Sequence, residues 1–555
     1  MIQWIDFDNS DTHICKVAED VLSEESQWTA HLCLQAQILP APLNINCTNY
    51  SRCIAHLCNQ QSRQQIWVKI NLKSNFCYKN LLDEHADDSR TGKLGWDIWN
   101  KLRIACGHTQ RLGVVLVLSG EEEDESEIEL NRWIAEPVKA IHIHTRVFVR
   151  NRKGYPVLTP VIQRFLSKFM QSKIHILIQG KPKIGSVYGH DDVQNSLLPY
   201  VQYIRHLEKI YQQGLSGAFS EKFTEEYTDH IQAPLQPLMD NLESQTYDVF
   251  EKDPVKYMLY ENAMKRAFTD KKATAENEIV KVAILGAGRG PLVAAALRAS
   301  AITETKIQIT AIEKNKNAII TLRNRIKNEN WGNVTVVSTD MRFWSPREDE
   351  LVDIMVSELL GSWGDNELSP ECLDGGQKCL KHDGISIPQE YTSFVAPVSA
   401  SKVWNSARSM PKGLDTPFVV KLGHCHFLND PLPLFKFNHP RQDVHTNNNS
   451  RYETVSFKIP HNAIVHGFCG TFESVLYQDT PLMSIHPQTH SPEMFSWFPI
   501  FLPLHAPVSV NKGDDLTLAV WRCVDERKVW YEWCLLSPIQ TPIQNTSGSN
   551  YWIGL

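Results

Sequence analysis

The sequence predicts a multidomain α/β protein whose last part is rich in β-strands, and three observations support this prediction. Before residue 215, apolar runs typical of buried strands alternate with a helical pattern, as in a parallel α/β domain such as a barrel. Residues 280–299 read as a strand, a glycine-rich turn and a helix, which begin a doubly wound sheet. The last ~165 residues contain short β-branched and aromatic runs separated by Pro, Gly and Asn, which indicates antiparallel strands.

The composition is that of an ordinary globular protein. The chain has 555 residues, of which 42% are hydrophobic and 21% charged, so a disordered, collagenous or coiled-coil protein is excluded. The net charge of −7 provides no general attraction to nucleic acid or to an anionic membrane. The N-terminus lacks a signal pattern, no apolar run is long enough to span a membrane, and the 13 cysteines lack zinc-ligand spacing. We therefore expect an intracellular protein with free thiols and no metal.

The first predicted domain covers residues 1–215. Its strand patterns lie at residues 114–118, 140–144 and 174–178, and a helical rhythm occupies residues 159–173. No convergent acid, base or phosphate-binding loop follows these strands, so we expect the domain to be a scaffold. The acidic run at 121–129 is predicted to be a solvated loop, and residues 216–245 are predicted to be a linker.

The second predicted domain covers residues 246–390 and contains the glycine-rich turn. Gly286, Gly288 and Gly290 follow the strand at 280–285, and further strands are expected at 307–312, 334–337 and 352–356, with a helix at 318–326. The spacing is G-x-G-x-G and not the G-x-G-x-x-G of dinucleotide sites, which disfavours an NAD-dependent oxidoreductase. No helix-length apolar periodicity follows residue 388, so residues 391–555 are predicted to form a β domain.

Two acids follow the next two strands of this sheet. Glu313 ends the second strand, where a carboxylate can accept hydrogen bonds from both ribose hydroxyls. Asp340 follows the third strand, where it can bind the amino group of adenine while Met341 packs on the ring. Each acid alone is more typical of a surface or capping residue. Together with the glycine turn they predict an adenosine without phosphates, and S-adenosylmethionine is the common cofactor of that kind.

Two further carboxylates, Glu358 and Glu367, bracket the loop after the fourth strand. A solvated acidic loop is the simpler interpretation, but Leu359, Leu360 and Trp363 lie between the acids. Burying carboxylates among apolar groups is unfavourable unless a cation joins them. A guanidinium fits this requirement because its planar fork matches carboxylates, so we predict arginine as the substrate.

These motifs resemble the type II protein arginine N-methyltransferases, which produce symmetric dimethylarginine. The resemblance rests on residues 285–292, 357–371 and 495–499 and runs nearly continuously from about Gln232 to Leu555. It implies an N-terminal TIM-type barrel, a Rossmann-like class I methyltransferase domain and a C-terminal β-barrel that carries dimer contacts. It also implies that Glu358 and Glu367 are the catalytic pair, and it assigns the ribose to Glu313 and the adenine to Asp340 and Met341.

The resemblance further implies a lid at residues 247–257 that covers the cofactor. In the lid, Phe250 stands where type II enzymes have phenylalanine and asymmetric-dimethylating enzymes have methionine, so symmetric dimethylarginine is the expected product. The residues implied to line the methionine end of the cofactor are Tyr247, Lys256, Tyr257 and Arg289, with Lys256 and Arg289 beside its carboxylate. Those implied to contact substrate are Gln232, Leu235, Phe250, Trp497 and His490, although a structural role for the histidine is left open.

The sequence departs from the family pattern at Trp363 and Gly364, where Phe-Ala is expected, and this change could alter the flexibility of the loop. The resemblance implies histone tails and Gly/Arg-rich Sm-type proteins as substrates, a homo-oligomer, a WD-repeat partner on the N-terminal barrel, and a location in cytoplasm and nucleus. Two alternatives stay open: a catalytically idle scaffold with a methyltransferase fold, and a small-molecule methyltransferase.

Overall fold

The computed structural model describes most of the chain, and the described residues form two compact units. One unit comprises Met1–Gly217 with His424–His426, and the other comprises Ala218–Gly423 with Phe427–Leu555. The acidic run at 121–129 lies outside the described residues. No described helix has the length and apolarity needed to cross a membrane. The described ranges are 6–42, 46–60, 63–72, 94–118, 130–170, 174–182, 196–214, 224–274, 278–443, 448–479 and 482–555.

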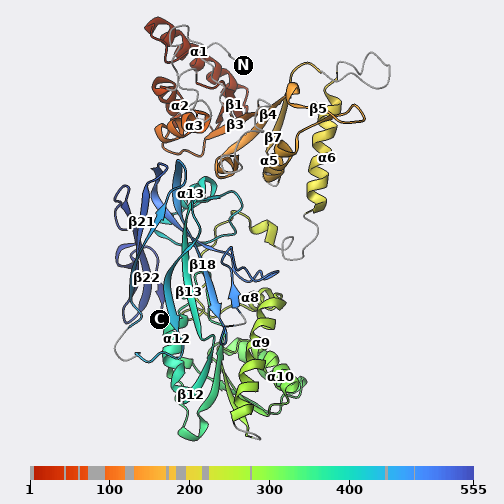
Figure 1. Cartoon of the computed structure of the whole chain (residues 1–555). Coiled ribbons are helices and arrows are strands. Elements are labelled where there is room, and N and C mark those ends of the chain that lie inside the picture. The colour runs from red at the N-terminus through yellow and green to blue at the C-terminus, as the bar shows by residue number, and fades with distance from the viewer. Residues whose placement is uncertain are drawn as a thin grey trace. The chain divides into compact units, whose positions relative to one another are not determined.

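The first unit is built on a five-stranded parallel sheet in the order β1-β2-β3-β4-β7 (Figure 1). Strand β3 is buried along nearly its whole length, as expected for an inner strand of a parallel sheet. The predicted strands β3, β4 and β7 and the predicted helix α5 are all present, which confirms the parallel α/β prediction. The elements are α1 (Thr12–His31), β1 (Ala36–Leu39), α2 (Thr48–Asn59), β2 (Gln65–Asn71), α3 (Leu94–Ala105), β3 (Leu112–Leu118), β4 (Val138–His144), α5 (Pro160–Met170), β7 (His175–Gln179) and α6 (Leu198–Gly214), with a short hairpin of β5 (Val149–Arg150) and β6 (Pro156–Val157).

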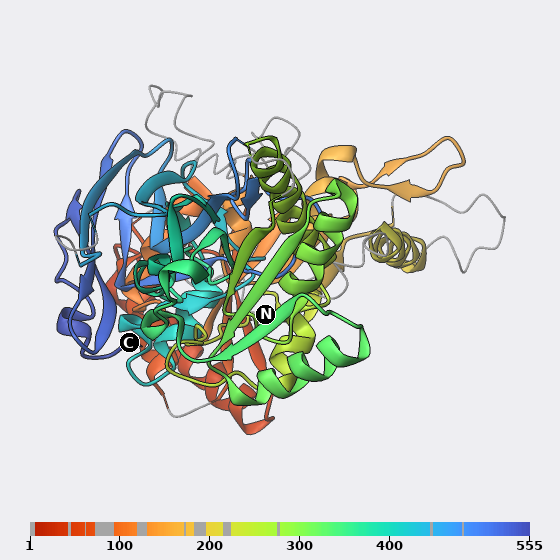
Figure 2. The same cartoon turned by 90° about the horizontal axis from the view of Figure 1, so that it is seen from below.

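The second unit begins with two helices and a five-stranded sheet. The sheet is parallel in the order β10-β9-β8-β11-β12, so the glycine turn follows the central strand, β8; the strands of this sheet are among the green arrows of Figure 2. Helix α10 begins with Pro291 directly after this turn and packs small alanines against the sheet. This arrangement confirms the doubly wound prediction. The elements are α8 (Ser244–Phe250), α9 (Pro254–Thr274), β8 (Val280–Leu285), α10 (Pro291–Thr303), β9 (Ile307–Glu313), α11 (Lys316–Asn328), β10 (Val334–Ser338), β11 (Val352–Ser357), α12 (Ser369–Gly376) and β12 (Leu380–Ile387).

The C-terminal part of the second unit is mostly antiparallel, as predicted. Its larger sheet contains β14-β20-β18-β13 in that order with β16 on β13 and β19 on β18, and its smaller sheet has the order β17-β21-β22-β23. The expectation of no helix after residue 388 is wrong, since helix α13 lies there. The sequence did not reveal this helix because only eight residues form it, and so short a helix gives little periodic signal. The elements are β13 (Glu390–Ser399), α13 (Ser401–Arg408), β14 (Phe418–Val419), β16 (Leu432–Asn438), β17 (Arg451–Lys458), β18 (Ala463–Val475), β19 (Leu482–Ser484), β20 (Ile500–Val510), β21 (Asp515–Val524), β22 (Lys528–Ser537) and β23 (Ile553–Gly554).

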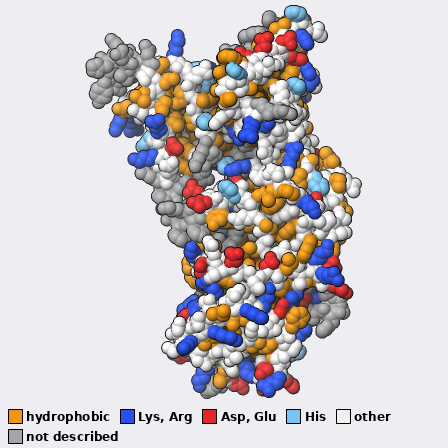
Figure 3. Space-filling view, turned by 180° about the vertical axis from the view of Figure 1, so that it is seen from behind, with side chains coloured by type: hydrophobic (Ala, Val, Ile, Leu, Met, Phe, Trp, Pro, Cys, Tyr) orange, Lys and Arg blue, Asp and Glu red, His pale blue; other side chains and the backbone are white. Residues whose placement is uncertain are grey.

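The larger of the hydrophobic clusters described for the second unit runs from its parallel sheet into both antiparallel sheets. It joins Ile284 and Val356 of the parallel sheet to Phe468 of the larger antiparallel sheet and Trp533 of the smaller one. The parallel sheet and the β domain are therefore held together by buried apolar surface, the main favourable contribution to folding. Acidic and basic side chains are interspersed over the face drawn in Figure 3, in keeping with the small net charge.

Candidate active site

The first pocket of the second unit lies at the glycine turn. Gly286 and Gly288 have φ angles of +75° and +52°, which glycine adopts without strain. A Cβ atom on Gly288 would approach the Tyr247 ring to 3.2 Å, so the turn leaves just enough room for helix α8 above it. The lining includes the predicted residues Tyr247, Phe250, Tyr257, Gly286, Gly288, Arg289, Glu313, Asp340 and Met341, together with Glu358 and Glu367.

Glu313 ends strand β9 with its carboxylate turned toward the glycine turn. Its Oε2 accepts a hydrogen bond from the Gly288 N–H at 2.7 Å, and its Oε1 accepts one from the Asn315 N–H at 2.6 Å. Burial raises the pKa of the carboxyl, and the backbone hydrogen bonds oppose this rise. Each carboxylate oxygen retains acceptor capacity after one hydrogen bond, so Glu313 can also bind two hydroxyl groups of a ligand.

Asp340 follows strand β10 and caps a short helical turn that contains Met341. Its carboxylate accepts hydrogen bonds from the Arg342 backbone at 2.9 Å and from the Arg342 guanidinium at 2.9 Å. Burial favours the neutral form of this acid, but the hydrogen bonds and charge of Arg342 outweigh it and lower the pKa of Asp340. Asp340 is therefore an ionised acceptor at the edge of the pocket.

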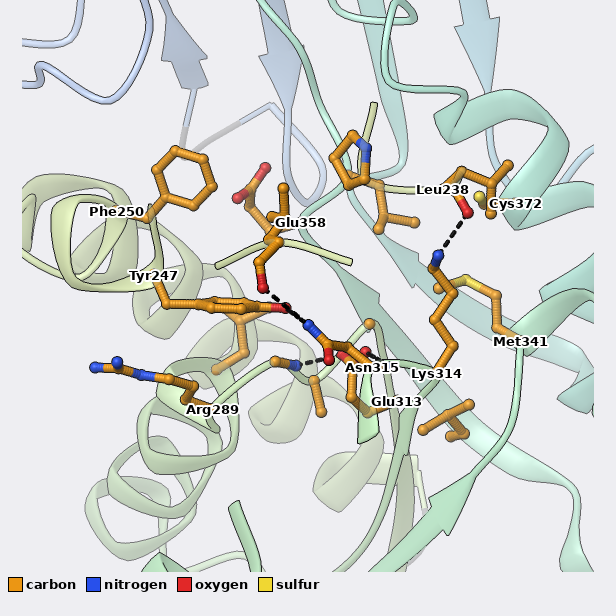
Figure 4. A pocket seen from close by; sticks show the side chains of 18 of the residues that line it. Leu238, Tyr247, Phe250, Arg289, Glu313, Lys314, Asn315, Met341, Glu358 and Cys372 are labelled. Atoms are coloured by element: carbon orange, nitrogen blue, oxygen red, sulfur yellow. Dashed lines mark hydrogen bonds between the residues drawn. The ribbon is translucent and has the colours of Figure 1, made fainter. Parts of the chain in front are cut away.

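Helix α8 is fastened over the first pocket by two sets of contacts (Figure 4). The Asn315 amide donates a hydrogen bond to the Tyr247 hydroxyl at 3.2 Å. The Arg289 guanidinium binds Glu251 with two hydrogen bonds and Asp248 at 2.6 Å, and it points away from Glu313. The hydrogen bond to Glu251 is the main cause that raises the pKa of Arg289, and the hydrogen bond to Asp248 and the charges of both acids add to it against the effect of burial. Arg289 thus holds the helix in this structure, and its role at a cofactor carboxylate stays a prediction.

The second pocket adjoins the first and shares Phe250, Glu358 and Glu367 with it. Glu367 is partly exposed, and no described residue donates a hydrogen bond to its carboxylate. Burial, and next the negative charge of Glu358, raise the pKa of Glu367 well above the ordinary carboxyl value. A bound cation would favour the ionised form of such a carboxyl and offset the repulsion by Glu358. The pocket also contains the predicted residues Gln232, Leu235, Lys256 and Trp497.

A cation of the protein itself already lies beside this acid pair. The Lys256 ammonium is 3.4 Å from Glu358 Oε2 and 5.0 Å from the centre of the Trp497 ring. It also lies 5.1 Å from the Phe250 ring and 4.9 Å from the Tyr257 ring. Burial is the largest single influence and opposes the charge of Lys256, but the charge of Glu358, with those of Tyr257 and Asp253 and the hydrogen bond to Glu358, raises its pKa. Carboxylates and aromatic faces therefore form a cation site here, since aromatic rings attract cations over their faces.

Trp497 is held in place from two sides. Its indole N–H donates a hydrogen bond to the Leu360 carbonyl at 2.8 Å, and its ring meets Phe472 edge to face at 5.3 Å between centroids. The loop that follows Leu360 is equally fixed, because the Trp363 indole is fully buried and donates to the Phe394 carbonyl at 2.8 Å. Gly364 has a φ angle of +84°, which glycine adopts more readily than the expected alanine.

The loop of residues 358–371, which we call the clamp loop, is anchored to the β domain by Arg522. This guanidinium is fully buried and binds Asp365 at 2.6 Å and both oxygens of Glu371 at 2.7 and 2.8 Å. Tyr531 donates a further hydrogen bond to Asp365 at 2.6 Å. Sequence reasoning missed Arg522. The signal that could have found it is its place within the largely apolar stretch 516–524, because a buried arginine requires a buried acid nearby.

Two predicted residues lie apart from the places assigned to them. Lys256 lines the second pocket and not the first, and its place at the cofactor stays a prediction. His490 is exposed on the segment after β19 and lines neither of these two pockets. Among the described residues, no group of three or more His, Cys, Asp or Glu side chains is arranged to hold a metal ion.

The first pocket fits S-adenosylmethionine by the chemistry of its lining. Glu313 provides acceptors for ribose hydroxyls, and Asp340 provides an acceptor at the next strand end. The two cations of the lining are already engaged by protein oxygens, Arg289 by two acids and Lys314 by the Leu238 carbonyl (Figure 4). A nucleoside without phosphates is therefore the better match.

Comparisons with known proteins identify relatives of this chain. Family models described as PRMT5 TIM barrel domain, PRMT5 arginine-N-methyltransferase and PRMT5 oligomerisation domain match residues 1–210, 218–387 and 390–553. Protein arginine N-methyltransferase 5 of Oryza sativa subsp. indica is 41% identical over 575 residues, which span 100% of this chain and 87% of the relative. The Xenopus laevis protein of the same name is 41% identical over 569 residues, with the same coverage. A solved Trypanosoma brucei PRMT1 enzyme-prozyme complex is 15% identical with a TM-score of 0.45, covering 56% of this chain and 98% of its own.

Proposed function

The chain belongs to the protein arginine N-methyltransferase 5 family, and we propose that its first pocket binds S-adenosylmethionine and its second pocket a protein arginine. The chain is an arginine N-methyltransferase with a TIM-type barrel, a Rossmann-like domain and a β domain. The type of product, the cofactor and the substrates are the parts that we propose.

One observation carries the assignment of the second pocket. Glu358 and three aromatic rings surround the Lys256 ammonium, and Glu367 lines the same pocket. A guanidinium makes the same kinds of contact and adds a planar fork that fits carboxylate oxygens. The pocket therefore suits an arginine side chain that enters past Trp497.

The residues of the clamp loop perform the chemistry that we propose. Glu358 and Glu367 bind the guanidinium and draw its positive charge toward the nitrogens that they contact. Another nitrogen keeps more lone-pair character and faces the first pocket, because both acids line the two pockets. When bound, S-adenosylmethionine would supply the methyl group on a positively charged sulfur and would leave as S-adenosylhomocysteine. The raised pKa of Glu367 suits it to accept the proton that the nitrogen releases.

We propose that the product is symmetric dimethylarginine, formed by way of monomethylarginine. Phe250 lines both pockets, so its ring lies where a methylated nitrogen would have to fit. The bulk of this ring would turn the monomethylated side chain and direct the second methyl group to the other terminal nitrogen. This argument rests on the phenylalanine that distinguishes type II enzymes.

The test uses a Gly/Arg-rich peptide and labelled S-adenosylmethionine, with mass spectrometry of the neutral losses that separate symmetric from asymmetric dimethylarginine. We expect symmetric product from the wild type and none from Glu358→Gln. The matched control is Glu390→Gln, which removes a carboxylate that pairs with Lys436 away from both pockets. Asymmetric product from the wild type would contradict the argument from Phe250. Full activity of Glu358→Gln would contradict the role of the acid pair.

Substrates and partners are inferred from the family. We propose histone tails and Gly/Arg-rich Sm-type proteins as substrates, which would be met in the nucleus and cytoplasm. The match of residues 390–553 to an oligomerisation domain supports an oligomer, and we propose a homodimer or a larger assembly. A WD-repeat partner on the N-terminal barrel belongs to the same proposal, and co-purification with the full chain tests it.

A further inference from the structure

We propose that Asp253 is a positioning residue. It fixes helix α9 and the loop containing Trp497 relative to each other, so that the second pocket keeps its shape. The proposal rests on the proposed function, because it assumes that the second pocket binds the substrate arginine. Asp253 is fully buried between α8 and α9.

One carboxylate oxygen of Asp253 caps helix α9. Oδ1 accepts hydrogen bonds from the Val255 N–H at 3.0 Å and from the Lys256 N–H at 3.4 Å. These N–H groups belong to the first turn of the helix and have no partner within it. The cap therefore fixes the start of α9, and with it the point from which the Lys256 side chain extends.

The other carboxylate oxygen binds a loop more than 200 residues away in sequence. Oδ2 accepts hydrogen bonds from the N–H groups of Phe495 and Ser496, both at 2.9 Å, and from the Ser496 hydroxyl at 2.7 Å. Trp497 is the next residue in this loop and lines the second pocket. A single carboxylate thus connects the backbone at the start of helix α9 to the backbone of the loop that carries Trp497.

The five donors explain why an acid is needed at this position. Among the residues that the structure describes, none forms a salt bridge with Asp253, so five hydrogen bonds stabilise the buried carboxylate. An ionised carboxylate has about four lone-pair sites and no donor, so both of its oxygens can accept at once. An asparagine has one oxygen and would present its NH₂ group to one of the two sets of donors.

We call the contacts of Asp253 with α9 and with the Trp497 loop the Asp253 joint. The first pocket does not depend on the loop side of this joint, because Phe495, Ser496 and Trp497 line the second pocket and not the first. Helix α8 is held by Arg289 through Glu251 and by Asn315 through Tyr247. Neither contact involves Asp253. Loss of the joint should therefore weaken the peptide site and spare the cofactor site.

The test measures both sites in Asp253→Asn. Asparagine is a good helix cap, so we expect its oxygen to keep the cap of α9 and its NH₂ group to face the donors of the Trp497 loop. The KM for a Gly/Arg-rich peptide should rise about tenfold, while the calorimetric Kd for S-adenosylmethionine should change by less than about twofold. An unchanged KM would overturn the proposal, and so would equal losses at both sites.

A control and a double-mutant cycle separate positioning from general stability. Asp415 accepts hydrogen bonds from the Asn545 N–H, the Asn550 amide and His505 at 2.8 to 2.9 Å and lines neither pocket, so Asp415→Asn should lower the thermal midpoint without changing KM. Ser496→Ala should raise KM in the wild type and add nothing in Asp253→Asn, since the two residues form one contact.

Equal effects of Ser496→Ala in both backgrounds would contradict the joint. If the wild type methylated no peptide, the proposed function would fail instead. The same double-mutant cycle, measured by thermal unfolding midpoints, would then test the contact between Asp253 and Ser496 without any activity. Additive shifts of the midpoint would contradict the contact.

Discussion

Replacing Arg522 by methionine should destabilise the second unit more than most single substitutions. The guanidinium is fully buried and makes three short hydrogen bonds to Asp365 and Glu371, with a fourth to the Asn449 carbonyl at 3.1 Å. Without the cation, Asp365 stays fully buried and Glu371 nearly so, each with a negative charge. Removing one partner of such a buried pair costs roughly 3–5 kcal/mol, because the other charge is left uncompensated.

The same substitution should lower turnover because the two acids flank Glu367 in the clamp loop. Asp365 is two residues before Glu367, and Glu371 lies in the first turn of helix α12, four residues after Glu367. When repulsion displaces Asp365 and Glu371, the carboxylate of Glu367, for which we propose a catalytic role, loses its position between them. We therefore expect kcat to fall even at temperatures where Arg522→Met remains folded.

Urea unfolding followed by circular dichroism, with methylation assays below the transition, measures both effects. Arg347→Met is the control, because Arg347 pairs with acids on the exposed surface and should give no measurable shift in the unfolding midpoint. The triple variant Arg522→Met, Asp365→Asn, Glu371→Gln removes all three charges and should recover part of the stability. A midpoint like that of the wild type for Arg522→Met, or a triple variant no more stable than the single one, would refute the reasoning.

Further predictions concern the two pockets and the clamp loop. Peptide affinity should rise as the pH rises through the raised pKa of Glu367, because the ionised form of this carboxyl binds the guanidinium. Fluorescence titrations should show a flatter pH profile for Glu367→Gln, and a wild-type profile without slope would contradict the assignment. Glu313→Gln should weaken S-adenosylmethionine by about 1.5–3 kcal/mol, the contribution of hydrogen bonds to a charged group, and calorimetry that finds wild-type affinity would exclude the ribose role. A Cβ atom on Gly470 would lie 2.6 Å from the Trp363 indole nitrogen, so Gly470→Ala should lower the thermal midpoint, and adding Trp363→Phe should restore part of it if this contact is the cause.

The sequence predicted the parallel sheet of the second unit more completely than that of the first. Strand β8 is buried along nearly its whole length and therefore reads as an apolar run, and strand β9 ends in the buried residues Ala311, Ile312 and Glu313. Strand β2 alternates buried residues with the partly exposed Trp67, Lys69 and Asn71, so its sequence lacks such a run. Strand β12 was also missed, because Lys381, His382 and Asp383 interrupt its apolar pattern.

The candidate site shows the same division between local and long-range signals. Glu358 and Glu367 could be singled out because apolar residues surround them within one short loop. Asp253 and Arg522 could not, since the partners of Asp253 lie 242 and 243 residues away and Asp365 lies 157 residues from Arg522. In both cases a buried charge connects the Rossmann-like part to the β domain. The β domain therefore shapes the candidate site directly: it supplies Trp497, binds Asp253 through the neighbouring loop, and holds the clamp loop through Arg522.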